Sequence, residues 1–292
     1  MNYMKAEKMK VLLVATVQSH ICQFHRPLVA MLHEHDCEVH VAARNNLAEK
    51  NGLKLDFVER VFDVPFQRSP FSPKNLGAYK QLKKIIDEGN YDVVHCNTPV
   101  GGVLGRLAAR KARKRGTKVF YTAHGFHFYQ GAPKKNWLIW YPVEKFMCRH
   151  TDKLITITQE DYDLASAKFP TQVERIHGVG ANSAKYHKLS EAECAALRCE
   201  LGYAEDEKIL LCTGELLPNK NQITAIRAMK TLIEHQPKAK LLLAGNGPTL
   251  PELQAEVTAL ELQSYVEFLG YRTDLERYAN IADVIVSCSY RE

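Results

Sequence analysis

The segment 92–124 reads DVVHCNTPVGGVLGRLAARKARKRGTKVFYTAH, and it contains the pattern that decides the fold. Two short apolar runs, 92–96 and 118–122, flank a segment with helical character, 103–115. Apolar strands joined by a helix are typical of a parallel sheet that is covered on both faces. We therefore predict an α/β fold built on doubly wound parallel sheets.

The same alternation continues on both sides of this segment and predicts two tandem Rossmann-like domains. In the first half it predicts strands at 10–16, 38–43 and 153–158 and helices at 25–35, 76–88 and 137–149. A glycine-containing loop at 178–187 and a short helix at 190–200 follow. A second series then has strands at 209–213, 239–244, 265–269 and 284–287 and helices at 222–235, 251–260 and 274–279. We expect domains at 1–183 and 184–292, the second of them incomplete.

Composition is that of an ordinary globular protein, because 46% of the 292 residues are hydrophobic and 25% are charged. The net charge of +6 is too small for a dedicated nucleic-acid packing protein. No segment approaches the roughly 20 apolar residues that span a bilayer, and the N-terminal segment does not have the pattern of a signal peptide. The eight cysteines include no Cys-x-x-Cys pair. These features predict a cytoplasmic protein with free thiols.

Ligands of such sheets bind beyond the carboxyl ends of the strands, and the loop 214–221 follows one of them. It reads GELLPNKN and leads into a helix, whose free N–H groups and positive dipole end suit a phosphate. Lys220 would add a full charge there. The alternative is that Asn219 caps the helix and Lys220 is solvated.

The next strand of the second series ends in AGNGP, residues 244–248, where Gly245 and Gly247 permit a close approach of the backbone. The pattern could begin a dinucleotide fingerprint. However, Leu250 occupies the third small position, and Gly270 stands where an acidic residue would bind a ribose. We therefore do not expect an NAD site.

In the first series, the strand 118–122 leads into AHGFHFY, with His124 and His127 at the expected active edge of the sheet. A neutral histidine there could donate a hydrogen bond to a developing negative charge or to a sugar hydroxyl. The alternative is a pair of partly buried structural histidines. A zinc site would need a third ligand, and we expect no metal because the remaining histidines show no ligand spacing, namely His20, His25, His95 and His150.

Asp161 and Asp163 have the Asp-x-Asp spacing with which some sugar-nucleotide enzymes hold a divalent metal. They lie in the first turn of a predicted helix, where acidic residues complement the helix dipole. We favour that structural interpretation.

A basic run without acidic residues occupies 106–118, and aromatic residues between lysines follow it. Basic charge beside exposed aromatic side chains predicts docking on an anionic membrane. The alternative is a solvated helix face and a buried aromatic stripe, and nucleic-acid binding is a weaker option. The residues predicted to contact the membrane or the acceptor are Arg110, Lys111, Arg113, Lys114, Trp137 and Trp140, and the run also contains Arg106.

Taken in order, these loops resemble the retaining group 1 glycosyltransferases of the GT-B fold, in particular bacterial enzymes of capsule and exopolysaccharide assembly. The resemblance extends over nearly the whole chain. The motifs that carry it are 122–129 (TAHGFHFY), 214–222 (GELLPNKNQ), 244–248 (AGNGP), 268–274 (FLGYRTD) and 282–292 (ADVIVSCSYRE).

The resemblance implies a hexosyltransferase that moves a sugar from a nucleotide-sugar donor, of the UDP type, to a lipid-linked glycan at the inner face of the plasma membrane. It implies no metal and no other cofactor. His124 or His127 would lie at the transfer centre, and Glu292 would address hydroxyls of the donor sugar as the first glutamate of a Glu-x7-Glu motif. The first domain would be on the acceptor side. The donor-binding residues would be Gly214, Lys220 and Asn221 near the diphosphate, Gly245 and Gly247 along the nucleotide, and Tyr271 and Arg272 near the base.

The chain departs from the family pattern in two places. Glu215 stands where many relatives have an arginine, although the polysaccharide branch often has Gly-Glu-Leu there. The pattern also stops at Glu292, before the second glutamate, and this predicts impaired activity and a less stable second domain. Two alternatives remain open, a GT-B sugar-nucleotide 2-epimerase and a non-catalytic remnant or half of a split transferase.

Overall fold

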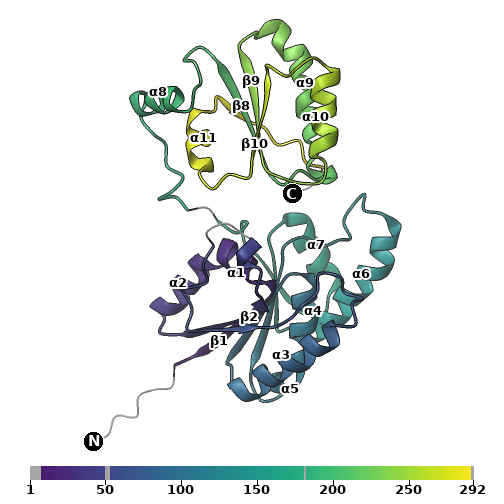
Figure 1. Cartoon of the computed structure of the whole chain (residues 1–292). Coiled ribbons are helices and arrows are strands. Elements are labelled where there is room, and N and C mark those ends of the chain that lie inside the picture. Colours follow the sequence, from purple (N-terminus) through teal and green to yellow (C-terminus); the bar gives the residue numbers. More distant parts are fainter. Residues whose placement is uncertain (1–7, 50–52, 181, 291–292) are drawn as a thin grey trace, which may run out of the picture. The chain divides into compact units, whose positions relative to one another are not determined.

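The computed structural model describes residues 8–49, 53–180 and 182–290, and the chain divides into two compact units, 1–180 (unit 1) and 181–292 (unit 2). Each unit contains one sheet whose strands all run parallel, with helices on both faces (Figure 1). The predicted α/β fold with two Rossmann-like domains is confirmed. None of the helices in the described ranges is long and apolar enough to cross a membrane.

Unit 1 has a seven-stranded sheet with the order β3-β2-β1-β4-β5-β6-β7. Its elements are β1 (Lys10–Val17), α1 (Gln18–Phe24), α2 (Arg26–Glu34), β2 (Glu38–Arg44), η1 (Leu47–Glu49), β3 (Arg60–Asp63), α3 (Asn75–Gly89), β4 (Val93–Asn97), α4 (Pro99–Ala108), α5 (Arg110–Arg113), β5 (Lys118–Ala123), α6 (Lys134–Met147), η2 (Cys148–His150), β6 (Lys153–Thr156), α7 (Gln159–Lys168) and β7 (Gln172–Arg175).

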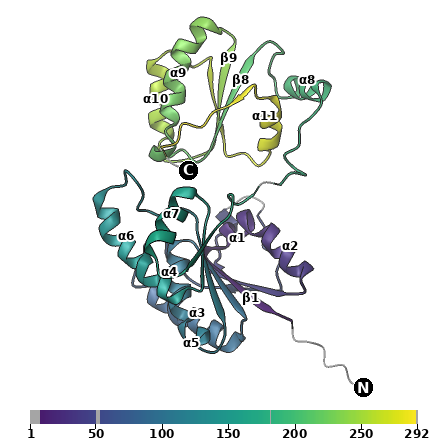
Figure 2. The same cartoon turned by 180° about the vertical axis from the view of Figure 1, so that it is seen from behind.

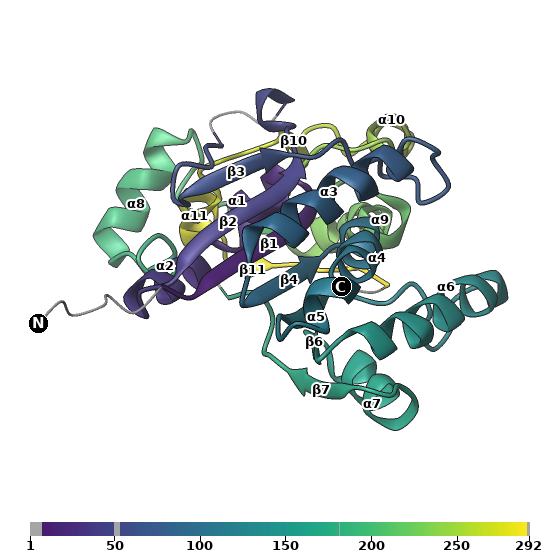
Figure 3. The same cartoon turned by 90° about the horizontal axis from the view of Figure 1, so that it is seen from below.

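The central strands of this sheet are buried along most of their length because both faces are covered. Leu12, Leu13 and Val14 in β1 have no exposed surface. Helices α1 and α2 cover one face, while α3, α4 and α5 pack on the other (Figure 3). Continuous burial of this kind explains why the strands read as unbroken apolar runs.

Unit 2 has a four-stranded sheet with the order β10-β9-β8-β11. Helices α9 and α10 contribute to the core on one face, and α8 and α11 contribute to the core on the other (Figure 2). Its elements are α8 (Glu191–Glu200), β8 (Lys208–Thr213), η3 (Pro218–Lys220), α9 (Gln222–His235), β9 (Ala239–Ala244), α10 (Leu250–Ala259), β10 (Val266–Gly270), α11 (Leu275–Ile281) and β11 (Val284–Ile285).

Three sequence-based predictions of elements differ from the structure. The predicted helix 103–115 is two helices, α4 and α5, and α4 begins at Pro99, whose fixed φ suits a first helical position. The predicted helix 25–35 is preceded by a separate helix, α1. Strands β3 and β7 were not predicted, because they are short, lie at the sheet edges and are only partly buried.

Candidate active site

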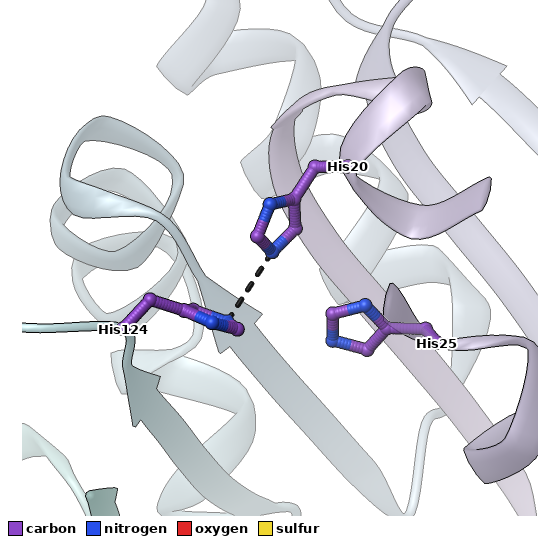
Figure 4. Close-up of side chains that lie close together, drawn as sticks. All are labelled: His20, His25 and His124. Atoms are coloured by element: carbon purple, nitrogen blue, oxygen red, sulfur yellow. Dashed lines mark hydrogen bonds between the residues drawn. The ribbon is translucent and has the colours of Figure 1, made fainter. Parts of the chain in front are cut away.

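A cluster of histidines lies at the carboxyl edge of the unit 1 sheet. Strand β4 pairs with both β1 and β5, so the ends of these three strands lie next to one another. His20 comes from α1, His25 separates α1 from α2, and His124 follows β5. In Figure 4 the three rings lie around one small region. His20 and His25 show no ligand spacing in the sequence, yet the strand order brings them next to His124, which is more than 100 residues from His20.

Asn97 at the end of β4 connects the histidines. Nε2 of His20 and Nε2 of His124 are 3.3 Å apart, and Nε2 of His124 is 3.4 Å from Oδ1 of Asn97. Nε2 of His25 donates to the same oxygen at 2.9 Å. The Asn97 amide has no exposed surface, and its Nδ2 donates to the His95 carbonyl, which directs Oδ1 toward the rings.

The environment of the cluster keeps its imidazoles neutral. Burial, and then the nearby His124 and His25, lower the pKa of His20 to about 3. Burial and His25 lower the pKa of His124 to about 4, and burial lowers the pKa of His25 as well. Each ring therefore carries one N–H donor and one lone pair at neutral pH. Such rings can donate a hydrogen bond to a substrate or coordinate a metal ion.

The loop after His124 is held by acidic residues of α7. The buried carboxylate of Asp161 accepts a hydrogen bond from the Phe126 amide at 3.2 Å, and Glu160 accepts one from the Gln130 amide at 2.7 Å. Asp163 accepts from the Gln159 side chain at 2.7 Å. These contacts support the structural interpretation of the Asp-x-Asp spacing, because both carboxylates are engaged within the protein.

His127 is not part of the cluster and lines two cavities that share several residues. Its exposed ring lies 5.3 Å from the ring of Trp140, measured between centroids. The first cavity is apolar, has a volume of about 160 Å³, and is lined by Phe71, Val103, Leu104, Phe126 and Ile139 among others. The second has a volume of about 290 Å³, is also lined mainly by apolar surface, and has Thr16, Arg68 and Thr98 in its lining. Trp140 and His127 line both cavities.

Thr98 has an unusual backbone conformation beside these cavities. Its φ of 62° and ψ of 155° lie in a region that β-branched residues rarely occupy. Thr98 Oγ1 accepts from the Thr16 amide at 3.0 Å and lies 2.7 Å from Thr16 Oγ1. Sequence analysis missed Thr98, although a threonine before a helix-opening proline at a strand end was a usable signal.

In unit 2 the loops after β8 and β9 pack backbone against backbone. The Gly214 amide donates to the Ala244 carbonyl at 2.9 Å, and the Leu216 amide donates to the Asn246 carbonyl at 3.0 Å. A Cβ on Gly245 would lie 1.9 Å from the Gly214 oxygen, and one on Gly247 would lie 2.1 Å from the Leu216 oxygen. Both glycines are therefore required by contacts within the protein.

Lys220 and Asn221 lie at the start of α9. The helix begins at Gln222, and Asn221, with a φ of 53°, occupies the position before it, so Asn219 is not the helix cap that the alternative interpretation required. The Asn221 side chain donates to the Cys288 carbonyl at 3.1 Å and accepts from the Thr224 hydroxyl at 3.1 Å. Lys220 is half-buried in the turn that precedes the helix.

The loop after β10 supplies the other predicted donor residues. Tyr271 is half exposed, and the Arg272 guanidinium forms two hydrogen bonds with Asp274, at 2.8 and 2.6 Å. Arg272 is therefore engaged within its own loop. Glu292, the third predicted catalytic residue, lies outside the described residues.

The basic run divides into buried and exposed residues. Arg106 has no exposed surface, donates to Glu144 at 2.8 Å and stacks 3.8 Å above the Tyr121 ring, so its assignment to an exposed basic run is wrong. Arg113 binds the Asp152 carboxylate through two nitrogens. The remaining three predicted cations are exposed and line a surface groove of about 580 Å³, namely Arg110, Lys111 and Lys114.

The aromatic segment is partly buried. Trp137 packs against the core and donates to the Tyr129 carbonyl at 3.1 Å, while Trp140 lines the cavities. Beside them, Phe71 and Leu138 are 78% and 79% exposed. Both tryptophans are partly buried, and the exposed apolar surface lies on the neighbouring residues Phe71 and Leu138.

Comparison with known proteins gives two family matches. Residues 10–158 match the family described as glycosyl transferase 4-like, and residues 195–292 match glycosyl transferases group 1. The chain is 45% identical over 285 residues to the putative glycosyltransferase EpsD of Bacillus subtilis, and the match covers 97% of this chain and 73% of EpsD.

Two further proteins are more distant. The UDP-Gal:alpha-D-GlcNAc-diphosphoundecaprenol alpha-1,3-galactosyltransferase of Escherichia coli is 27% identical over 251 residues, covering 83% of this chain and 64% of that enzyme. The crystal structure of Anabaena Alr3699/HepE in complex with UDP and glucose superposes with a TM-score of 0.72 at 21% identity, covering 96% of this chain and 74% of the other. This structural match supports the fold.

Proposed function

The chain belongs to the group 1 glycosyltransferases of the GT-B fold, and we propose that it transfers a hexose from a UDP-type nucleotide sugar to a lipid-linked glycan in the synthesis of a surface polysaccharide. The putative glycosyltransferase EpsD and the galactosyltransferase named for a diphosphoundecaprenol-linked substrate support this class of reaction. The observation that carries the acceptor assignment lies in unit 1.

That observation is the pair of adjoining cavities beside His127. Both cavities are lined mainly by apolar side chains, which suits a hydrocarbon chain, and the second also has Arg68 in its lining. An acceptor with an apolar chain and a diphosphate has chemical groups that match this lining. Arg68 would bind the diphosphate, because a guanidinium pairs well with phosphate oxygens.

We assign the donor to unit 2. Lys220 and the N-terminus of α9 would stabilise the negative charge of the departing nucleoside diphosphate. Gly214, Gly245 and Gly247 shape the adjacent loops, and the exposed Tyr271 ring would contact the base. The fixed backbone packing of these loops supports this assignment, because a preorganised site spends no free energy on ordering itself.

In the proposed reaction the bond between the anomeric carbon and the diphosphate breaks, and the acceptor hydroxyl attacks that carbon from the face that the diphosphate leaves. The configuration of the anomeric carbon is therefore retained. His124 would donate a hydrogen bond to a hydroxyl of the donor sugar as a neutral ring. The leaving diphosphate carries the developing charge, and we propose that the reaction requires no metal ion. Chelation by EDTA should then not abolish the activity.

We further propose that unit 1 docks on the anionic inner face of the plasma membrane. The exposed apolar side chains of Phe71 and Leu138 would enter the lipid interface, and the exposed cations of α5 and the residue after it would attract the headgroups. A lipid-linked acceptor could then enter the cavities from the bilayer.

Intrinsic fluorescence offers a direct test of acceptor binding, because the chain has two tryptophans and Trp140 lines both cavities. In a Trp137→Phe variant, a short-chain polyprenyl diphosphate sugar should change the Trp140 emission saturably. The same sugar diphosphate without its lipid is the control and should have little effect. Mass spectrometry after addition of UDP-sugars should then detect a glycosylated lipid.

Two results would contradict the proposal. One is an equal response to the lipid-linked and the lipid-free compound, which would remove the cavities as the acceptor site. The other is conversion of a UDP-sugar to its 2-epimer without any transfer, which would favour an epimerase.

A further inference from the structure

The histidine cluster of unit 1 has the composition and spacing of a metal site. We propose that His20, His25 and His124 bind a divalent transition-metal ion, and that zinc fits the site best. Within the part of the chain that the structure describes, this is the one group of at least three histidine, cysteine, aspartate or glutamate side chains whose ligand atoms could share an ion. One candidate ligand atom from each ring lies within 4.8 Å of the others (Figure 4).

The distance between the two closest nitrogens supports this proposal. Zinc binds imidazole nitrogen at about 2.0–2.1 Å, so two ligands of a tetrahedral zinc are about 3.3–3.4 Å apart. Nε2 of His20 and Nε2 of His124 are 3.3 Å apart. A zinc ion bound to both would therefore leave this distance almost unchanged.

The third candidate ligand is His25, whose Nδ1 makes no hydrogen bond to another side chain among the described residues. His25 is 95% buried, and its Nε2 donates to Asn97, which leaves the lone pair on Nδ1. Among the described residues, Nδ1 of His25 is one of the few buried side-chain nitrogens without a hydrogen-bond partner. A metal-bound histidine usually donates its other N–H to an oxygen in this way.

The kind of ion follows from the ligands. Three imidazoles without a carboxylate suit zinc, nickel or copper, and do not suit magnesium or calcium, which prefer oxygen. His95 lies nearby, but its Nε2 is hydrogen-bonded to the Thr122 hydroxyl at 2.8 Å, so it is not required as a ligand. Water would occupy a fourth position. When the metal ion binds, the proton that lies between Nε2 of His20 and Nε2 of His124 moves to Nδ1 of the ring that carries it. No net proton is released.

If the proposed function is correct, metal binding at this site should inhibit sugar transfer. If His124 hydrogen-bonds to the donor sugar, a bound metal ion occupies the nitrogen that it needs. Zinc should then inhibit a transferase whose reaction itself requires no metal, and a chelator should restore its activity.

Metal binding can be measured without any activity. The complete chain, with the exposed thiol removed by Cys199→Ser, is titrated with Co²⁺, whose visible spectrum reports tetrahedral coordination by nitrogen. Zinc affinity is then measured by competition with a chromogenic chelator. We expect one equivalent of metal per chain. His20→Ala should weaken binding by more than about tenfold, because loss of even an indirect partner of a ligand typically costs 10–100-fold.

Two further variants give the test its controls. His35→Ala removes an exposed histidine of unit 1 outside the cluster and should bind metal like the parent chain. Asn97→Ala should weaken binding by about 10–100-fold, because it removes the oxygen that orients His25. His20 is only half-buried, so its variant should fold even where a change of the buried His25 does not. Circular dichroism checks folding.

The outcomes separate the metal site from the transferase proposal. No cobalt spectrum in the parent chain, or equal metal affinity in His20→Ala, would overturn the metal site. If metal binds as expected but zinc leaves sugar transfer unchanged, the metal site stands and the role of His124 in transfer is wrong. If zinc inhibits the parent chain, the remaining activity of His20→Ala should no longer respond at the same zinc concentration.

Discussion

At the carboxyl edge of the unit 1 sheet, the side chains of His20, His25, Asn97 and His124 contact one another, whereas the same edge of unit 2 is built from loops that pack backbone against backbone. Unit 1 thus offers neutral side-chain donors and lone pairs beside apolar cavities. Unit 2 offers a rigid loop framework with Lys220 at the start of a helix. We propose that individual side chains determine the chemistry of unit 1, whereas in unit 2 the backbone shapes the site and Lys220 supplies its charge.

The largest effect is expected from the buried ion pair of unit 1. Glu144→Ala would leave the guanidinium of Arg106 buried without its counter-charge, which typically costs 3–5 kcal/mol of unfolding free energy. Urea unfolding followed by tryptophan fluorescence measures this, because both tryptophans lie in unit 1.

The matched control replaces the whole pair. Arg106→Met with Glu144→Leu removes both charges and should cost much less than Glu144→Ala alone. An equal loss in the single and double variants would mean that packing volume, and not the unpaired charge, sets the stability of this part of unit 1.

The next largest effect is expected in the free energy of membrane binding, which should depend on the exposed cations of unit 1 and not on those of unit 2. Replacing Arg110, Lys111 and Lys114 by glutamine should weaken binding to anionic liposomes by about 3 kcal/mol, at roughly 1 kcal/mol for each charge. The parent chain should be released as salt rises, because exposed charges are screened beyond about 8–10 Å near physiological ionic strength. Arg113 is left intact because it is bound to Asp152.

A variant of unit 2 with the same change in charge provides the comparison. In this variant glutamine replaces three exposed lysines, Lys188, Lys230 and Lys238. The variant should still bind the liposomes. Equal loss of binding in both variants, or retention of the parent chain on neutral lipid, would contradict docking through unit 1.

In unit 2 we expect a large loss of unfolding free energy when Gly247 is replaced. Gly247→Ala places a Cβ 2.1 Å from the Leu216 oxygen, and overpacking of this kind costs about 1–3 kcal/mol. Gly77→Ala in α3 is the control, since that position has open space and should gain about 0.5–1 kcal/mol. Circular dichroism should show an early transition for Gly247→Ala that tryptophan fluorescence, which reports unit 1, does not follow. Coincident shifts in both signals would show that the two units unfold together.

Much of the architecture could be predicted from sequence, because fully buried parallel strands leave unbroken apolar runs. The run 10–16 corresponds to β1 and the run 239–244 to β9. The edge strands β3 and β7 left no such signal, since they are only partly covered. The predicted loop residues of unit 2 do gather after adjacent strands, as the topology of a parallel sheet requires.

The histidine cluster could not be predicted in the same way. His20 and His25 follow β1 and His124 follows β5, two strands that are separated by β4 in the sheet. Only the strand order shows that they meet. The burial of Arg106 could not be predicted from the sequence either, because its partner Glu144 is 38 residues away and on a different helix.

An effect similar to that of Gly247→Ala is expected at the anchor of the His124 loop. Asp161→Ala leaves the Phe126 amide without its acceptor, at a cost of about 1–3 kcal/mol. Glu160→Gln is the control, because its amide oxygen can still accept from the Gln130 amide at the exposed end of the loop. Thermal unfolding compares the two. A larger loss for Glu160→Gln than for Asp161→Ala would show that the exposed contact, and not the buried one, holds the loop.

The central claim is that unit 2 binds the donor and unit 1 binds the acceptor. It is tested most directly by titrating UDP and a lipid-linked acceptor into one variant of each unit. Calorimetry should show that Lys220→Ala in unit 2 weakens UDP binding by about 1.5–3 kcal/mol, the range for a charge-assisted hydrogen bond, and leaves acceptor binding unchanged. Trp140→Ala in unit 1 should do the reverse. UDP binding that is unchanged in Lys220→Ala, or weakened as much by Trp140→Ala, would contradict the account.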